Sequence, residues 1–194
     1  MSFMLKGKLT ELRPFEPGHL ADPKYIGWLR DYDVIKTINR IDYVRPVSQS
    51  EVREYCDHLM TSHNDVFVAV HRISDDAFIG TVKAGNINWR TRVADIGVLI
   101  GDKDAWGQGI ATDALRTLCT YLFERLDMRR LTCGVMAVNP AIQRVFEKLG
   151  FQHEGTFREQ DLFEGEYVDH IYLGCLRDEF NSGKTTESNE TECQ

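Results

Sequence analysis

Apolar residues recur every three or four positions from Ile110 to Leu126, and the rest of the chain can be arranged around this repeat. Such spacing places the apolar side chains on one face of a helix. Gly107 and Gly109 stand directly before the repeat. The pattern therefore predicts a short glycine turn that leads without a break into a long helix with one buried face.

Shorter patterns predict the other elements, and their order indicates the fold class. Three strand candidates joined by short turns precede the glycine turn, as in an antiparallel meander, and the strand after the long helix suits a parallel crossover. We therefore expect an α+β fold with a mixed, mostly antiparallel sheet and helices on both faces. The expected strands are 8–13, 66–71, 78–88, 93–100, 131–138, 152–158 and 167–176; the other expected helices are 19–30, 48–63 and 140–149.

The chain has the length of a single domain, which we place at residues 1–180. An acidic segment at 159–166 lies between the last two expected strands and is interpreted as a loop. Residues 181–194 are polar and without periodicity, which predicts a disordered tail.

Composition narrows the class of protein. Hydrophobic residues make up 42% and charged residues 27% of the chain, as in soluble globular proteins. The net charge is −7 and Lys and Arg are scattered, so no nucleic-acid partner is expected. The longest apolar runs have the length of strands, so we expect no membrane association. The five cysteines form no CxxC pair and favour a reducing, cytoplasmic setting, and no cluster has the spacing of metal ligands.

The start of the long helix can bind an anion. Its first amides lack partners inside the helix and carry partial positive charge, while glycines let a phosphate approach the backbone. The spacing Gly107-x-Gly109-x-x-Thr112 has no third glycine and no following Gly-Lys-Ser/Thr, so it matches neither a dinucleotide fingerprint nor a P-loop. An ordinary glycine turn before a core helix explains the same residues, and other motifs have to decide.

Two motifs in the expected order resemble the Gcn5-related N-acetyltransferase family. The family's acetyl-CoA motif, Arg/Gln-x-x-Gly-x-Gly/Ala, is matched by Trp106 to Ala111 except at its first position. Its later motif, an Asn before a short helix that ends in Lys-x-Gly-Phe, is matched from Asn139 to Phe151. The resemblance covers residues 8–178 and is closest to the branch of ribosomal-protein N-terminal acetyltransferases (RimJ/RimL-like), in which Trp at position 106 is a familiar variant.

The resemblance implies how acetyl-CoA would bind. The central strands at 93–100 and 131–138 would form a splayed parallel pair that admits the pantetheine arm. The amides at the helix start would hold the pyrophosphate, and Asn139 would contact the cofactor arm as well as cap its helix. The residues implied to bind the cofactor are Gly97, Val98, Leu99, Trp106, Gly107, Gln108, Gly109, Ile110, Ala111, Thr112, Asn139 and Phe146.

Acetyl transfer requires a base for the amine and tolerance of the departing thiolate. We nominate Asp95 as the base, acting through water in place of the Glu often found on that strand. Glu159 and Asp161 compete for the role. His153 and His170 are less favoured, because a lone His in a strand more often has a structural role.

One departure from the family pattern concerns the acid that protonates the thiolate. Many members carry a Tyr seven residues after the motif Asn, where this chain has Phe146. Tyr167 or water would replace it, or the thiolate would leave without an acid. The missing Tyr also supports an alternative function, an acyl-CoA-binding module that senses or sequesters without turnover.

The acceptor would be a primary amine bound between the segment 32–50 and the loop 157–167. Four carboxylates around Phe163 would favour a cationic amine, although such a cluster can also be simply solvated. A protein α-amino terminus, a polyamine, an amino sugar and an amino acid all fit, and the protein can be a monomer or a homodimer. The carboxylates are Glu159, Asp161, Glu164 and Glu166.

Overall fold

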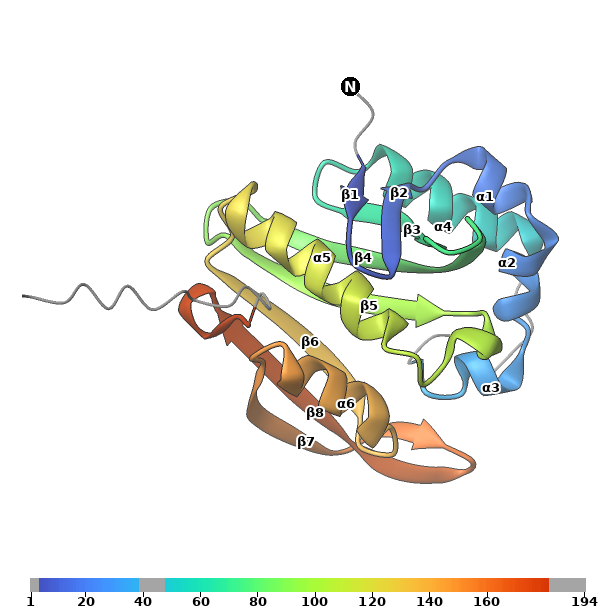
Figure 1. Cartoon of the computed structure of the whole chain (residues 1–194). Helices are drawn as coiled ribbons and strands as arrows, with labels where there is room; N and C mark the ends of the chain where they lie inside the picture. Colours follow the sequence, from blue (N-terminus) through green and yellow to red (C-terminus); the bar gives the residue numbers. More distant parts are fainter. Residues whose placement is uncertain (1–3, 39–47, 182–194) are drawn as a thin grey trace, which may run out of the picture.

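The computed structural model describes residues 4–38 and 48–181. Within them, eight strands form one sheet in the order β1-β2-β3-β4-β5-β6-β8-β7 (Figure 1). Neighbouring strands are antiparallel except β5 and β6, so the expected mixed, mostly antiparallel sheet is confirmed. The strands are β1 Leu5–Lys6, β2 Thr10–Pro14, β3 Val66–Arg72, β4 Phe78–Asn88, β5 Val93–Ile100, β6 Arg130–Met136, β7 Gln152–Phe163 and β8 Glu166–Leu176.

Helices cover both faces of this sheet. In Figure 1, α5 and α6 lie in front of the sheet and α4 lies behind it. The single helix expected at 19–30 is wrong: Asp22 ends α1 and caps α2 by accepting from the amide of Lys24, and Pro23 begins α2 because it cannot continue α1. The helices are α1 Pro17–Ala21, α2 Pro23–Trp28, α3 Tyr32–Ile35, α4 Gln49–Thr61, α5 Ile110–Glu124 and α6 Pro140–Lys148, with short 3₁₀ helices at Lys103–Ala105 and Arg177–Glu179.

Two apolar clusters fill the space between the sheet and its helices. The larger one packs α5 and α6 against one face and contains Leu131, Cys133 and Val135 of β6. The smaller one packs α1, α2 and α4 against the other face. Because side chains alternate along a strand, positions 132 and 134, occupied by Thr132 and Gly134, belong to the face away from α5. This assignment of the two faces decides which side of the sheet each polar group occupies.

The parallel pair β5 and β6 separates after three residue pairs. Val93, Ala94 and Asp95 pair with residues 130–132, and no further ladder pair joins the two strands in the described part of the chain. Beyond that point β5 stays paired with β4 as far as Ile100, and β6 stays paired with β8 as far as Met136. The expected splayed pair is therefore present.

The acidic segment at 159–166 forms most of a hairpin rather than the expected loop. Strand β7 continues to Phe163 and β8 begins at Glu166. Glu164 and Gly165 turn the chain with φ values of 50° and 87°, as a two-residue hairpin turn requires. An acidic sequence with Glu-Gly in place of the usual Asn-Gly concealed this turn.

Asp113 fixes the start of α5 to the N-terminal hairpin. Its carboxylate, only 6% exposed, accepts the amides of Lys8 (3.0 Å), Leu9 (2.9 Å) and Thr10 (2.9 Å) and the hydroxyl of Thr10 (2.7 Å). Asp113 also lies in the first turn of α5, where the helix dipole favours a negative charge. No sequence pattern indicated this anchor, because its partners lie more than 100 residues away.

We predict that Asp113→Ala lowers the free energy of unfolding by about 2–4 kcal/mol, because it leaves several buried donors without an acceptor. Asp113→Asn, which keeps one acceptor oxygen, is expected to cost less. Urea denaturation followed by circular dichroism measures both. Asp57→Ala, an exposed carboxylate on α4, serves as the control. Equal effects of Asp113→Ala and Asp57→Ala would show that the anchor does not stabilise the fold.

Candidate active site

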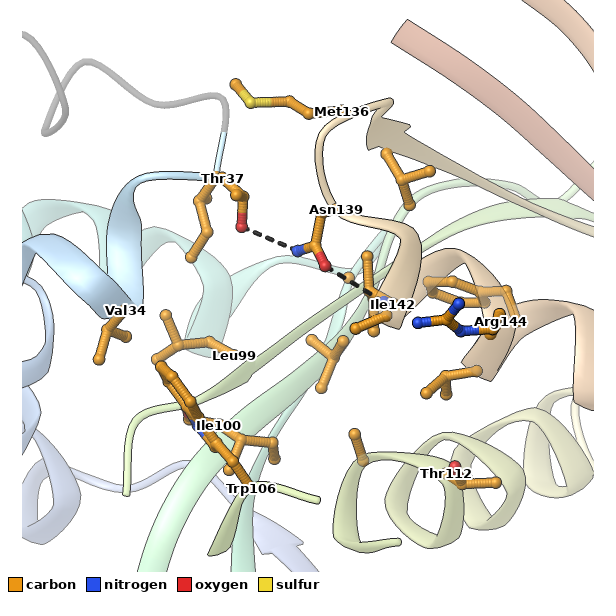
Figure 2. A pocket seen from close by; sticks show the side chains of 18 of the residues that line it. Val34, Thr37, Leu99, Ile100, Trp106, Thr112, Met136, Asn139, Ile142 and Arg144 are labelled. Atoms are coloured by element: carbon orange, nitrogen blue, oxygen red, sulfur yellow. Dashed lines mark hydrogen bonds between the residues drawn. The ribbon is translucent and has the colours of Figure 1, made fainter. Parts of the chain in front are cut away.

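A cavity of about 820 Å³ lies where β5 and β6 separate (Figure 2). Its walls come from the end of β5, the glycine turn and the start of α5, the middle of β6 and one face of α6, with residues of α3 and the turn after it closing one side. Apolar side chains make up much of the wall, as in many small-molecule sites. Of the twelve residues expected to bind a cofactor, all except Gln108 line it.

The glycine turn adopts a backbone conformation that side chains disfavour. Gly107 and Gly109 have φ values of 75° and 81°, in the left-handed region. An added Cβ would meet no atom within 4 Å at Gly107 and only Leu9 at 3.8 Å at Gly109, so conformation and not space requires glycine here. Gly109 is the N-cap of α5, and within the described chain no side chain caps this helix. Its first amides therefore face the cavity as an anion-binding end.

Trp106 and Gln108 support the same turn in different ways. The Trp106 indole donates to the carbonyl oxygen of Ile100 (2.8 Å), which holds the half-exposed ring beside the end of β5. Gln108 donates from Nε2 to the carbonyl oxygen of Asp104 (2.6 Å) and does not line the cavity. Trp106 thus lies at the cavity, whereas Gln108 stabilises the turn from outside.

Asn139 joins α6 to the segment after α3. Its Oδ1 accepts from the amide of Ile142 (3.2 Å), so it is the N-cap that the sequence predicted. Its Nδ2 donates to the hydroxyl of Thr37 (2.9 Å), and Figure 2 shows the side chain between these two partners. Phe146 lies further along α6, is 2% exposed, and packs on Phe151 with ring centroids 5.0 Å apart. Both positions of the later motif therefore shape the cavity wall.

Among the described residues, three cationic side chains line the cavity, and the sequence did not indicate them. Arg144 and Lys148 come from α6 and Lys36 follows α3. Lys36 donates to Asp33, and this hydrogen bond, together with Lys103, lowers the pKa of the Asp33 carboxyl. With the amides at the start of α5, the two cations of α6 make this side of the cavity suitable for an anionic ligand.

The four residues nominated as catalytic from the sequence lie outside the cavity lining. Burial raises the pKa of the Asp95 carboxyl, which accepts from the Thr132 hydroxyl at 3.1 Å. Glu159 is exposed on β7, has a φ of 52°, and donates its amide to Asp169 (2.9 Å). Tyr167 is 72% exposed on β8.

Asp161, the fourth nominee, is buried and paired with a histidine. It is 2% exposed, and its Oδ2 lies 2.5 Å from Nδ1 of His170. His170 in turn lines the cavity. From the sequence His170 was the less favoured residue, because no local pattern shows that a bulge in β7 brings Asp161 beside this ring.

Two general features concern the described residues as a whole. In 4–38 and 48–181 no helix has both the length and the apolar character needed to span a bilayer. Over the same residues no group of three or more His, Cys, Asp or Glu side chains is arranged to hold a metal ion.

Comparison with known proteins identifies the family. A family model described as an acetyltransferase (GNAT) domain matches residues 10–152, which is most of the chain. The chain belongs to the GNAT family of N-acetyltransferases. The probable N-acetyltransferase YjcK of Bacillus subtilis is 34% identical over 180 residues, covering 89% of this chain and 97% of YjcK.

Solved GNAT structures share the fold. A spermidine N-acetyltransferase from Vibrio cholerae, in complex with CoA and spermine, superposes with a TM-score of 0.79 at 22% identity, covering 88% of this chain and 97% of that one. RimL, a ribosomal L7/L12 α-N-protein acetyltransferase in complex with coenzyme A, gives 0.78 at 21% identity, covering 90% and 98%. The family and fold expected from the two sequence motifs are thus confirmed.

We predict that Asp95→Asn stabilises this GNAT domain at neutral pH. Because burial raises the pKa of Asp95 in the folded state, ionisation costs stability as pH rises from the ordinary Asp range through the raised pKa. The variant has no such ionisation, so its free energy of unfolding increasingly exceeds that of the wild type across this pH window. The full difference is about 1.4 kcal/mol for each unit between the folded and the unfolded pKa. Thermal unfolding from acidic to neutral pH measures it, and an advantage independent of pH would contradict the assignment.

Proposed function

We propose that the protein transfers an acetyl group from acetyl-CoA to a primary amine, by direct attack of the amine while both substrates are bound. The observation that carries this proposal is the cavity at the splayed strands, which reaches from the glycine turn on one side to His170 on the other. Membership of the GNAT family and the CoA-bound family structures with the same fold support it.

The residues present fit acetyl-CoA. The left-handed glycine turn and the uncapped start of α5 suit the pyrophosphate, and Arg144 and Lys148 add positive charge. Beyond Asp95, the backbone groups of β5 that face the gap have no strand partner among the described residues, so they remain for the pantetheine arm and the carbonyl oxygen of the thioester. Acetyl-CoA supplies the activated acetyl group, and the chain holds it beside the amine.

The acceptor is proposed to approach from the face opposite α5. This face carries Asp95 and the hairpin β7–β8, whose exposed carboxylates include Glu166. Tyr32 of α3 donates from its hydroxyl to Glu164 at the hairpin tip (2.7 Å), so α3 and the hairpin bound one space. Much of the segment 32–50 that was expected to complete this space lies outside the described residues. A cationic amine suits the carboxylates, and the named acceptors of family members, spermidine and a protein N-terminus, are both of this kind.

The cytoplasmic location, the monomeric or homodimeric state and the absence of nucleic-acid partners stay predictions from the sequence. The same holds for Tyr167 or water as the acid that protonates the thiolate and for the tail, since residues 182–194 lie outside the described chain. The alternative of an acyl-CoA-binding module without turnover keeps its support in Phe146, which stands where many members have the Tyr.

We predict that the wild type binds acetyl-CoA saturably, and that changing Gly107 and Gly109 together to Val weakens binding by roughly 30- to 1,000-fold. The reason is that valine disfavours the left-handed backbone by about 1–2 kcal/mol per residue. Isothermal titration calorimetry measures the affinity. Gly18→Val in α1, where an added Cβ meets no atom within 4 Å, is the control and should bind normally. No binding to folded wild type would contradict the proposed function.

We predict turnover with at least one member of an amine panel made up of N-terminal peptides, polyamines, amino sugars and amino acids. Release of the CoA thiol reports the reaction. For a cationic acceptor, Glu166→Gln should raise KM by about two- to threefold because the hairpin loses an exposed charge. Glu54→Gln on α4 is the matched control. Acetyl-CoA binding without turnover on any amine would favour the binding module instead.

A further inference from the structure

We propose that His170 is the general base of this enzyme, taking a proton from the acceptor amine at Nε2, and that Asp161 positions it. The inference rests on the proposed function, because it names the proton acceptor for the amine. It departs from Asp95, the base nominated from the sequence, since Asp95 does not line the cavity and His170 does.

The placement of the ring follows from strand register. His170 lies opposite Met136 on β6 and opposite Phe157 on β7. Directly opposed residues share a face of the sheet. Because Gly134 also points to that face, away from α5, His170 lies on the side from which the acceptor is proposed to approach.

Gly134 lets the ring lie against β6 at the gap. A Cβ at this position would collide with Nε2 of His170, so only glycine admits the ring here. Gly134 and His170 both line the cavity, and Gly97 lines it from the facing strand β5. Nε2 is therefore the ring nitrogen at the place where the two strands separate and where the thioester is proposed to lie.

Asp161 sets the proton arrangement of the ring. An ionised carboxylate can only accept, so its contact with Nδ1 at 2.5 Å requires the proton on Nδ1. Neutral His170 then has its lone pair on Nε2, ready to accept a proton. Three residues of β7 lie between Phe157 and Asp161, whereas one residue of β8 lies between their partners His170 and Val168. This bulge brings the buried carboxylate to the ring.

Groups from three strands surround the ring. Asp161 faces it from β7, Tyr172 packs on it from β8 with centroids 4.8 Å apart, and Asp95 of β5 interacts with it electrostatically. On β6, Gly134 and Met136 contribute no charge. In the proposed step, the positive charge that forms on the ring as the amine is deprotonated therefore lies beside the carboxylate of Asp161.

The proton balance is closed without another reactant. His170 Nε2 takes one proton from the ammonium, which frees the nitrogen lone pair to form the C–N bond with the thioester carbonyl carbon. The C–S bond then breaks, and the sulfur leaves with its electron pair. The second proton passes from the new amide nitrogen to the sulfur, directly or through Tyr167 or water. His170 returns its proton to solvent, to which its side chain is 12% exposed.

The test is the pH dependence of kcat and kcat/KM over about pH 5 to 9 with two acceptor amines of different basicity. In the wild type the rate should fall at low pH, the acidic limb of the profile. The midpoint of this limb should stay at the same pH when the acceptor is changed. His170→Gln should lose this limb and lower kcat by about 10²- to 10⁴-fold, while calorimetry shows unchanged affinity for acetyl-CoA. His153→Gln, an exposed histidine on β7 outside the cavity lining, is the matched control and should behave as wild type.

Asp161→Asn tests the positioning role. It removes an anionic neighbour of the imidazolium, so the acidic limb should move to lower pH and kcat should fall less than in His170→Gln. If His170→Gln does not fold because Asp161 is left buried without the ring, the double variant with Asp161→Asn replaces the pair by two neutral amides. It should show the same loss as the single variant.

The possible outcomes distinguish the role of His170 from the proposed acetyltransferase function. Wild-type turnover with kcat and the acidic limb unchanged in the His170 variants would overturn the inference alone. A wild type that turns over no amine would overturn the proposed function and the inference with it. An acidic limb that moves with the basicity of the acceptor would assign the titration to the amine and would also overturn the role of His170.

Discussion

The structure depends on how little β5 and β6 are paired. Three residue pairs hold them together, and beyond these each strand keeps its antiparallel partner on the other side, β4 for β5 and β8 for β6. Within the described chain, each strand is therefore unpaired at the gap along one edge only, and its other edge stays hydrogen-bonded. Because unpaired backbone groups in a protein need hydrogen-bond partners, the gap is suited to bind an extended ligand with polar groups.

Helix α5 holds the two halves of the sheet at this separation. Its buried residues pack in one cluster with side chains from both β4 and β6, so the halves cannot drift apart without exposing that core. Asp113 fixes the N-terminal end of the helix to the hairpin β1–β2 through four hydrogen bonds. The same interactions that stabilise the fold thus direct the first amides of α5 toward the cavity.

The two faces of the sheet carry different chemistry. The face under α5 and α6 is apolar near the strands and positively charged at its rim, which suits a long ligand with phosphates. The opposite face carries Asp95, the pair of Asp161 and His170, and an acidic hairpin, which suits an amine. The cavity lies where the strands separate, and in the proposed reaction this arrangement would bring an acyl donor and an amine acceptor together.

The sequence by itself determined most of the elements and the residues on one side of the cavity. Periodicity located the long helix, and the glycine turn and Asn139 could be recognised because short-range rules govern them: left-handed backbone needs glycine, and a helix start needs a cap. Eleven of the twelve expected cofactor residues therefore lie at the cavity.

Only the tertiary structure decided the arrangement of the opposite face, around His170 and the hairpin β7–β8. The acidic segment 159–166 became a hairpin because pairing with β8 satisfies its backbone, and a bulge that no local pattern announces placed Asp161 beside His170. The anchor at Asp113 was likewise invisible, since its donors lie about a hundred residues away in the chain. Contacts of this kind depend on strand register and on packing between distant segments, and local patterns in a single sequence do not predict them.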